Sequence, residues 1–146
     1  MNYLKITQLA LLFFMTFTSA QICPVATETR ITEIENIYVK HGDKACISAR
    51  GQLNEGSGWA DLDGKYLNFT ISDINGNKIV SETEKISFWD GKASVNIDTY
   101  NLIPGSYAID VKYMGNKYLR PCKIHASLLV ISPSSSFQTQ NVRCKL

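Results

Sequence analysis

Four cysteines are the residues with the clearest capacity for chemistry: Cys23, Cys46, Cys122 and Cys144. Thiols of this kind form disulfides, bind zinc or act as redox pairs. No two of them have the spacing of about two to four residues that zinc sites use, and neither histidine lies at ligand spacing from one. No Cys-x-x-Cys motif is present. An even count in an exported chain indicates disulfides, so we expect two bridges and no metal site.

The carboxylates and histidines form no catalytic motif. The chain has no Gly-x-Ser-x-Gly elbow, no His-Glu-x-x-His and no Gly-rich phosphate loop. Glu55, Asp61 and Asp63 are close in sequence, but their spacing specifies no reaction. His41 belongs to a His-Gly-Asp turn, and His125 faces outward from a predicted strand. We therefore expect no enzymatic activity, no catalytic residue and no cofactor.

The candidate binding residues lie mainly in the segment Gly51–Gly64, which we predict to be the longest irregular stretch of the chain. Recognition residues are often carried by loops on a rigid scaffold. Trp59 could stack on a sugar or fill a partner's pocket, with Asp61 and Asp63 beside it. Two alternatives remain open: Trp59 could cover the open end of the core, and Asp61-Leu62-Asp63-Gly64 fits a plain turn better than part of a calcium loop.

Three further positions stand out by their patterns. Tyr118, in the loop Met114–Arg120, is a second candidate for binding. Asn68-Phe69-Thr70 is a glycosylation acceptor pattern, and strand alternation places Asn68 on an outer face; the pattern matters only if the source is a eukaryote. Tyr107 follows a Pro-Gly turn and resembles the tyrosine corner of β-sandwiches, which is a structural role.

The first 20 residues have the pattern of a cleavable secretory signal: a positively charged start, an apolar run, and small residues before a cut between Ala20 and Gln21. The apolar run is about half the length that spans a bilayer. After cleavage, 14 basic and 13 acidic residues remain, without the basic stripe of a nucleic-acid-binding protein. We expect a secreted protein, periplasmic or on the cell surface if the source is Gram-negative, with no nucleic-acid partner and no membrane span.

Residues 21–132 read as one domain made of strands. Apolar and polar residues alternate with period two between turn signals, and no helical period persists. Strands are expected at 31–39, 45–49, 67–71, 79–83, 86–89, 93–97, 107–113 and 123–131. This spacing predicts an all-β, immunoglobulin-like sandwich of two antiparallel sheets with seven or eight strands, followed by a polar tail at 133–146.

Several short motifs resemble the immunoglobulin-like repeats of bacterial and archaeal surface adhesin-like proteins. They are Val39-Lys40-His41-Gly42-Asp43, Leu67-Asn68-Phe69-Thr70-Ile71, Asn75-Gly76-Asn77, Asp90-Gly91-Lys92-Ala93 and Leu102-Ile103-Pro104-Gly105-Ser106-Tyr107. The resemblance covers most of residues 29–131, but such repeats usually occur in arrays without cysteines. It implies a non-enzymatic recognition or adhesion module that binds an extracellular protein or glycan through its end loops. The alternatives are a structural subunit of a coat or matrix, with self-association, and a soluble carrier or inhibitor.

The sandwich topology favours one of the three possible disulfide pairings. In such a fold the first strand can run parallel to the last, and the second strand starts at the opposite end. Cys23 and Cys122 then share one end, while Cys46 and Cys144 share the other. Alternation places Cys46 on the outer face, which argues against a bridge through the core. We therefore predict the bridges Cys23–Cys122 and Cys46–Cys144.

Overall fold

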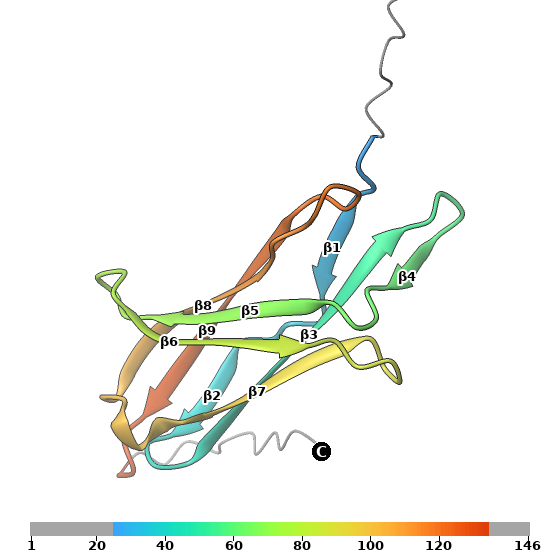
Figure 1. The fold of residues 1–146 in the computed structure, drawn as a ribbon. Coiled ribbons are helices and arrows are strands. Elements are labelled where there is room, and N and C mark those ends of the chain that lie inside the picture. Colours follow the sequence, from blue (N-terminus) through green and yellow to red (C-terminus); the bar gives the residue numbers. More distant parts are fainter. Residues whose placement is uncertain (1–24, 135–146) are drawn as a thin grey trace, which may run out of the picture.

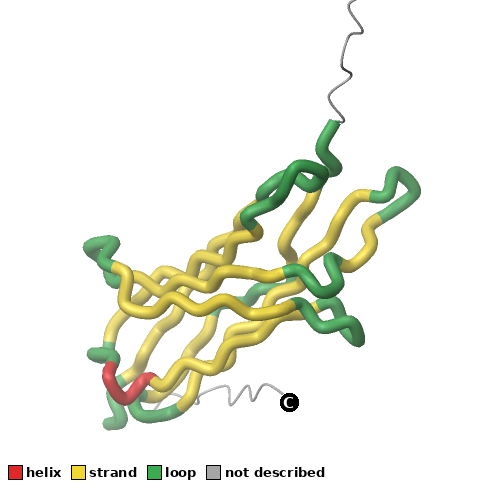
Figure 2. The backbone as a smooth tube through the Cα atoms, viewed as in Figure 1, coloured by secondary structure: helices red, strands yellow, loops and turns green. Residues whose placement is uncertain are grey.

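The computed structural model describes residues 25–134, so the predicted signal segment at 1–20, Cys23, Cys144 and most of the predicted tail lie outside the described residues. Two β-sheets face each other across a common core, and strands make up most of residues 25–134 (Figure 2). The elements are β1 (Thr29–Thr32), β2 (Ile37–Lys40), β3 (Lys44–Asn54), β4 (Trp59–Asp61), β5 (Tyr66–Ser72), β6 (Lys78–Lys85), β7 (Lys92–Asp98), the 3-10 turn η1 (Thr99–Asn101), β8 (Gly105–Tyr113) and β9 (Cys122–Ile131).

The chain changes sheets between its first two strands (Figure 1). In the first sheet, β3 is the central strand: β1 pairs with the half that ends at Leu53, β7 pairs with the half that begins at Lys44, and β4 continues beyond β7. The second sheet has the order β2-β9-β8-β5-β6. All pairings are antiparallel except that of β2 with β9, which is parallel. The predicted all-β, two-sheet immunoglobulin-like sandwich is thus confirmed, with nine strands in residues 25–134 rather than seven or eight.

The period-two alternation of the sequence produces the core. In β3, Ala45, Ile47 and Ala49 are at most 2% exposed and face the second sheet. Leu67, Phe69 and Ile71 of β5 and the alternating apolar residues of β8 pack against them from the other side. Burial of apolar surface contributes roughly 25 cal/mol per Å², so this interleaved layer supplies most of the stability that holds the loops in place.

Two of the expected strands and the expected irregular stretch differ from what is observed. The stretch predicted as one strand from residue 31 to 39 is two strands in different sheets, separated by Glu33, which has a left-handed φ of 57°. A residue in that conformation cannot continue a strand. Residues 86–89 are a turn rather than a strand, and Gly51–Gly64 is largely a β3–β4 hairpin rather than an irregular loop.

Two other predictions are confirmed. Tyr107 is a tyrosine corner: its hydroxyl donates to the carbonyl of Ile103 at 2.6 Å. The turn at His41-Gly42-Asp43 joins β2 to β3, with Gly42 at φ 93°. Within residues 25–134, the structure contains no helix that is long and apolar enough to span a membrane.

Candidate functional site

Trp59 and Asp61 lie on the outer face of the first sheet, where the β3–β4 hairpin holds them. Asn54 and Gln52 of β3 are their cross-strand neighbours. The Trp59 ring is 37% exposed, and the guanidinium carbon of Arg30 in β1 lies 4.0 Å from its centre. Trp59 therefore does not cover the core, and the alternative that assigned it that role is wrong. Leu62, one residue beyond β4, points inward instead and is 1% exposed.

Asp61 is occupied by an ion-pair network on this face. Arg50 donates Nε to Oδ1 of Asp61 at 2.7 Å and an NH2 nitrogen to Oδ2 at 2.9 Å, a two-point pairing. Its other terminal nitrogen contacts Glu33 at 3.1 Å, and Lys92 contacts Glu33 at 2.7 Å. The hydrogen bonds from Arg50 lower the pKa of Asp61 despite partial burial. The pKa of Glu33 is lowered by Lys92 first and Arg50 second. Asp61 thus holds strands together rather than presenting a carboxylate to a ligand.

The turn between β6 and β7 places two aromatic side chains in solvent. Trp89 is 97% exposed and Phe88 is 65% exposed. The turn is closed by hydrogen bonds from Ser87 N to the carbonyl of Lys92 at 2.8 Å and from Gly91 N to the carbonyl of Ser87 at 3.1 Å. Trp89 N also donates to the Ser87 hydroxyl at 3.2 Å. The turn therefore carries its aromatic residues on a hydrogen-bonded support.

This turn packs beside β4 and the turn that follows it. Gly51 N donates to the carbonyl of Gly91 at 3.2 Å. A Cβ on Gly91 would lie 2.2 Å from Cγ of Asp61, and a Cβ on Gly64 would lie 2.8 Å from Cζ of Phe88. Figure 1 shows the β3–β4 hairpin, the turn after β4 and the turn before β7 on the same side of the domain. We refer to Trp59, Asp63, Phe88 and Trp89 as the aromatic edge.

The remaining sequence candidates lie elsewhere or remain untested. Asp63 is exposed in the turn after β4, as the turn interpretation predicts. Tyr118 is 56% exposed in the β8–β9 loop, which is tied to the start of β1 by a hydrogen bond from Thr27 N to its carbonyl at 2.8 Å. Tyr118 lies in the β8–β9 loop rather than on β4 or the β6–β7 turn, so we treat it as a separate candidate. Asn68 is partly exposed on the outer face of β5, and its Oδ1 accepts a hydrogen bond from Thr83 at 2.8 Å; its glycosylation stays a prediction.

The two predicted disulfides stay predictions, because Cys23 and Cys144 lie outside the described residues. Of the two described cysteines, Cys46 is disulfide-bonded, and Cys122 forms no disulfide with a described residue. Burial raises the pKa of the Cys122 thiol, although a hydrogen bond with Thr29 opposes the shift. Cys46 lies outside the core cluster, as the alternation predicts, and is nevertheless only 6% exposed.

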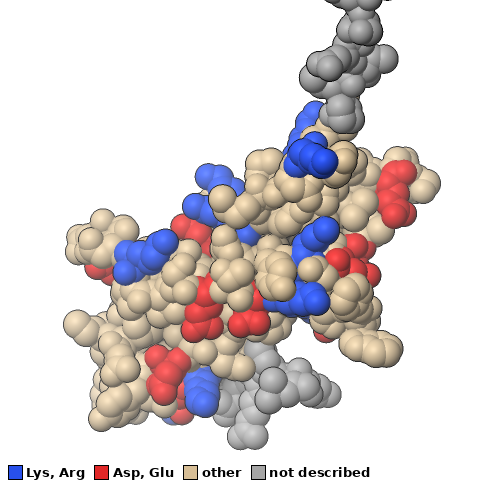
Figure 3. Space-filling model, viewed as in Figure 1, with Lys and Arg blue, Asp and Glu red and all other residues tan. Residues whose placement is uncertain are grey.

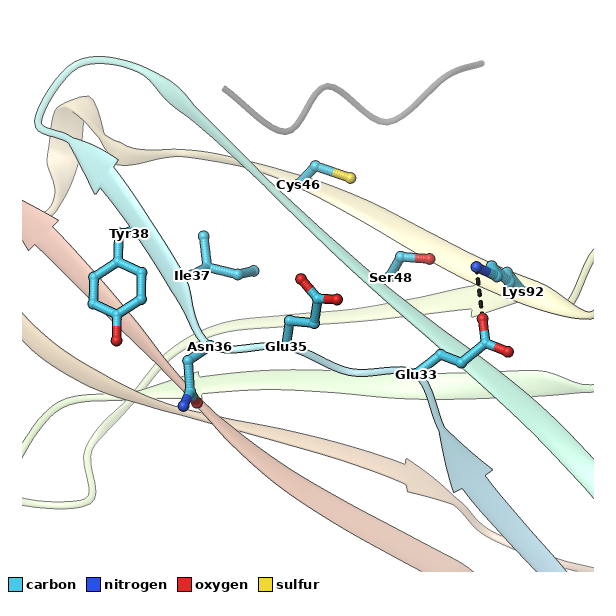
Figure 4. Close-up of a pocket in the computed structure, with 8 residues that line it drawn as sticks. All are labelled: Glu33, Glu35, Asn36, Ile37, Tyr38, Cys46, Ser48 and Lys92. Carbon is cyan, nitrogen blue, oxygen red and sulfur yellow. Dashed lines mark ion pairs between the residues drawn. The ribbon is translucent and has the colours of Figure 1, made fainter. Parts of the chain in front are cut away.

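A cavity of about 220 Å³ lies where the chain passes from the first sheet to the second. Residues 33–38 form one wall, and Cys46, Ser48 and Lys92 form the other (Figure 4). No group of three or more metal-ligating side chains occurs within residues 25–134. Lysine, arginine, aspartate and glutamate are interspersed on the visible face, without a large patch of one sign (Figure 3).

The comparisons with known proteins give structural neighbours of low sequence identity. No family model matches the chain, and no curated protein matches it. Among solved structures, it resembles a tetra-tandem repeat from the extending region of a large adhesion protein at 18% identity and a TM-score of 0.47, covering 72% of this chain. The chain spans only 24% of that structure.

Two other structural neighbours come from different settings. The PKD domain of human KIAA0319 matches 83% of this chain and 96% of its own, at 12% identity and a TM-score of 0.49. A family 123 glycoside hydrolase from Clostridium perfringens covers 74% of this chain with 28% of its own, at 13% identity and a TM-score of 0.47. No binding or catalytic role follows from these neighbours for this chain.

Proposed function

We propose that this chain is a secreted recognition module that binds an extracellular protein through its aromatic edge. The observation that carries the proposal is Trp89, 97% exposed on a turn that its own hydrogen bonds close. Its neighbour Phe88 is 65% exposed, and contiguous exposed apolar side chains often mark contact surfaces. Tryptophan is also among the residues that contribute most binding energy at protein interfaces.

The shape of the edge favours a protein over a glycan. Trp89 projects from the tip of a turn, so its ring suits insertion into a partner's pocket. A sugar platform needs a flat ring with polar groups free beside it. Trp59 has Arg30 against its ring, and the nearby carboxylate of Asp61 is held by Arg50.

A site-specific cross-link tests the proposal directly. A photoreactive phenylalanine analogue is placed at position 89 of the oxidised chain and irradiated on intact cell surfaces of the source. The same analogue at Tyr100, which is 72% exposed at η1, is the matched control. We expect one protein adduct from position 89 that is absent from position 100, and competition by unlabelled protein should abolish it.

The Trp89→Ala variant provides the second arm. It should lose the adduct partner in a capture experiment while keeping the urea unfolding midpoint, because an exposed side chain contributes little to stability. Capture of soluble glycans only, unaffected by Trp89→Ala, would contradict a protein partner. Equal adducts from positions 89 and 100 would contradict the aromatic edge as the contact surface.

A structural subunit is the alternative with the next best support. β6 is an edge strand of eight residues, and edge strands can pair with a second copy. Its exposed side chains include Lys78, Glu82 and Lys85, and charges on an edge usually oppose such pairing. A soluble carrier has less support, because side chains from both sheets fill the space between them. Sedimentation over a hundredfold range of concentration separates a stable monomer from a self-assembling subunit.

A further inference from the structure

We propose that the cavity at the sheet switch is the docking site for the C-terminal segment of this same chain, with Arg143-Cys144-Lys145 seated there and Cys144 bonded to Cys46. The proposal is independent of the aromatic edge. The C-terminal segment, which we call the strap, would then cross the first sheet and be anchored in this cavity.

The first observation is the state of Cys46. It lies on the outer face of β3, lines the cavity, and is disulfide-bonded rather than a free thiol. Its bonded partner is not Cys122, the other described cysteine. Cys23 and Cys144 are the two remaining cysteines of the sequence.

The distance along β3 is too long for Cys23 to be the partner of Cys46. Asn54 N donates to the carbonyl of Glu28 at 2.9 Å, so Glu28 lies beside the end of β3 that is eight residues from Cys46. Eight residues of strand span about 26 Å. Cys23 precedes Glu28 by five residues, a reach of at most about 18 Å, whereas a disulfide needs Cα atoms within about 7 Å. Because β1 is antiparallel to β3, the chain before Glu28 also leads away from Cys46.

The exit of the last strand places Cys144 within reach. β9 ends at Ile131, whose carbonyl accepts a hydrogen bond from His41 N at 2.9 Å. His41 belongs to the turn that leads into β3, so β9 ends beside the start of the strand that carries Cys46. Ten residues separate Ser134 from Cys144, enough for about 33 Å of extended chain.

The cavity also fits the charges of this segment. Glu33 and Glu35 come from its N-terminal wall, and Glu35 is exposed and has no ion pair among residues 25–134. Lys92 is the cavity's one cation, and it already contacts Glu33 at 2.7 Å. Arg143 and Lys145 flank Cys144 in the sequence. Opposite charges at such a surface raise the effective concentration of the two thiols.

The strap would cover an otherwise open strand edge. β1 pairs with β3 only from Arg50 to Leu53, and β2 belongs to the other sheet. On that side, the part of β3 between Lys44 and Ala49 pairs with no strand of the described chain. Closing the bridge transfers two electrons and two protons from the two thiols to a small disulfide such as oxidised glutathione, which leaves as two thiols.

Peptide mapping without reduction is the first test. The full secreted chain is alkylated, digested and analysed as a monomer. A Cys46–Cys144 peptide is expected. A peptide that joins Cys46 to Cys23 or Cys122, or a bridge found only between two copies, would overturn the proposal.

The second test asks whether the cavity is the docking site. The Cys46 bridge is equilibrated with reduced and oxidised glutathione, and the fraction closed is measured for Glu35→Lys and for the control Glu55→Lys. Glu55 is exposed in the β3–β4 hairpin, far along β3 from the cavity. We expect Glu35→Lys to lower the closure constant by about two- to fivefold, as for an exposed ion pair, and Glu55→Lys to leave it unchanged. Equal effects would overturn docking in the cavity, and partner capture through Trp89 should not change in either variant.

Discussion

Replacement of Gly91 by alanine should destabilise the domain more than replacement of any exposed turn glycine. Gly91 has φ 66°, and a Cβ there would lie 2.2 Å from Cγ and 2.4 Å from Oδ2 of Asp61. Gly76 is a matched control, since it has φ 81° and a Cβ there meets no atom within 4 Å. Both variants carry the backbone cost of the left-handed region, which is about 1–2 kcal/mol for an L-residue.

The difference between the two variants isolates the steric conflict with Asp61. Forcing extra volume into a packed site costs typically about 1–3 kcal/mol. We therefore expect Gly91→Ala to lower the free energy of unfolding by about 2–5 kcal/mol and Gly76→Ala by about 1–2 kcal/mol. The Asp61 carboxylate must move to make room for the new Cβ, so its hydrogen bonds with Arg50 should be lost.

Urea unfolding followed by tryptophan fluorescence measures both values, because Trp89 lies in the turn that contains Gly91 and Trp59 lies in β4, against which Gly91 packs. The m-value, which is the slope of the unfolding free energy against urea concentration, must match that of the wild type for the comparison to hold. If Gly91→Ala and Gly76→Ala lose equal stability, Gly91 of the β6–β7 turn does not pack closely on Asp61 of β4. The proposed contact surface would then lose its support, because that packing positions Trp89.

Three further outcomes follow from individual contacts. The pKa values of Asp61 and Glu33 are lowered on folding. Their contribution to stability is therefore present above about pH 4 and is lost as the pH falls through the lowered pKa values. The urea midpoints at pH 7 and pH 3 should differ less in Asp61→Asn than in the wild type. Tyr107→Phe removes the hydrogen bond to Ile103 and should cost about 1 kcal/mol in the same assay; no change would show that the corner is not stabilising. The Phe69 side chain is 1% exposed in the core, so Phe69→Ala should lower the free energy of unfolding by about 3–5 kcal/mol. A loss below about 1 kcal/mol would refute the packing of this side chain between the sheets.

The core and most strands could be predicted from the sequence because alternation is a local signal. Ile47, Phe69 and Val111 each alternate with polar neighbours, and each is buried. The corner at Tyr107 could be predicted for the same reason, since its partner Ile103 is four residues away. Local patterns specify which face of a strand is apolar, and burial follows.

The sheet switch could not be predicted in this way. Residues 31–39 contain no Gly or Pro, although their apolar alternation is interrupted at Glu33, whose left-handed backbone divides them. Glutamate has no special preference for positive φ. Its carboxylate contacts Arg50 and Lys92, which are 17 and 59 residues away in sequence. The break is therefore stabilised by long-range ion pairs that no window of sequence contains.

The same long-range register decides which candidate side chains are available to a partner. Asp61 and Trp89 are both turn-proximal residues of types that bind ligands, and sequence favours Asp61 because it lies beside Trp59. The pairing of β4 with β3 places Asp61 diagonally across from Arg50, so its carboxylate is consumed within the fold. Trp89 has no cross-strand neighbour, because residues 86–89 form a turn instead of the strand that their composition predicts. A side chain is available to a partner where strand pairing ends. Trp89 is therefore better placed for recognition than Asp61, because residues 86–89 form a turn and not the predicted strand.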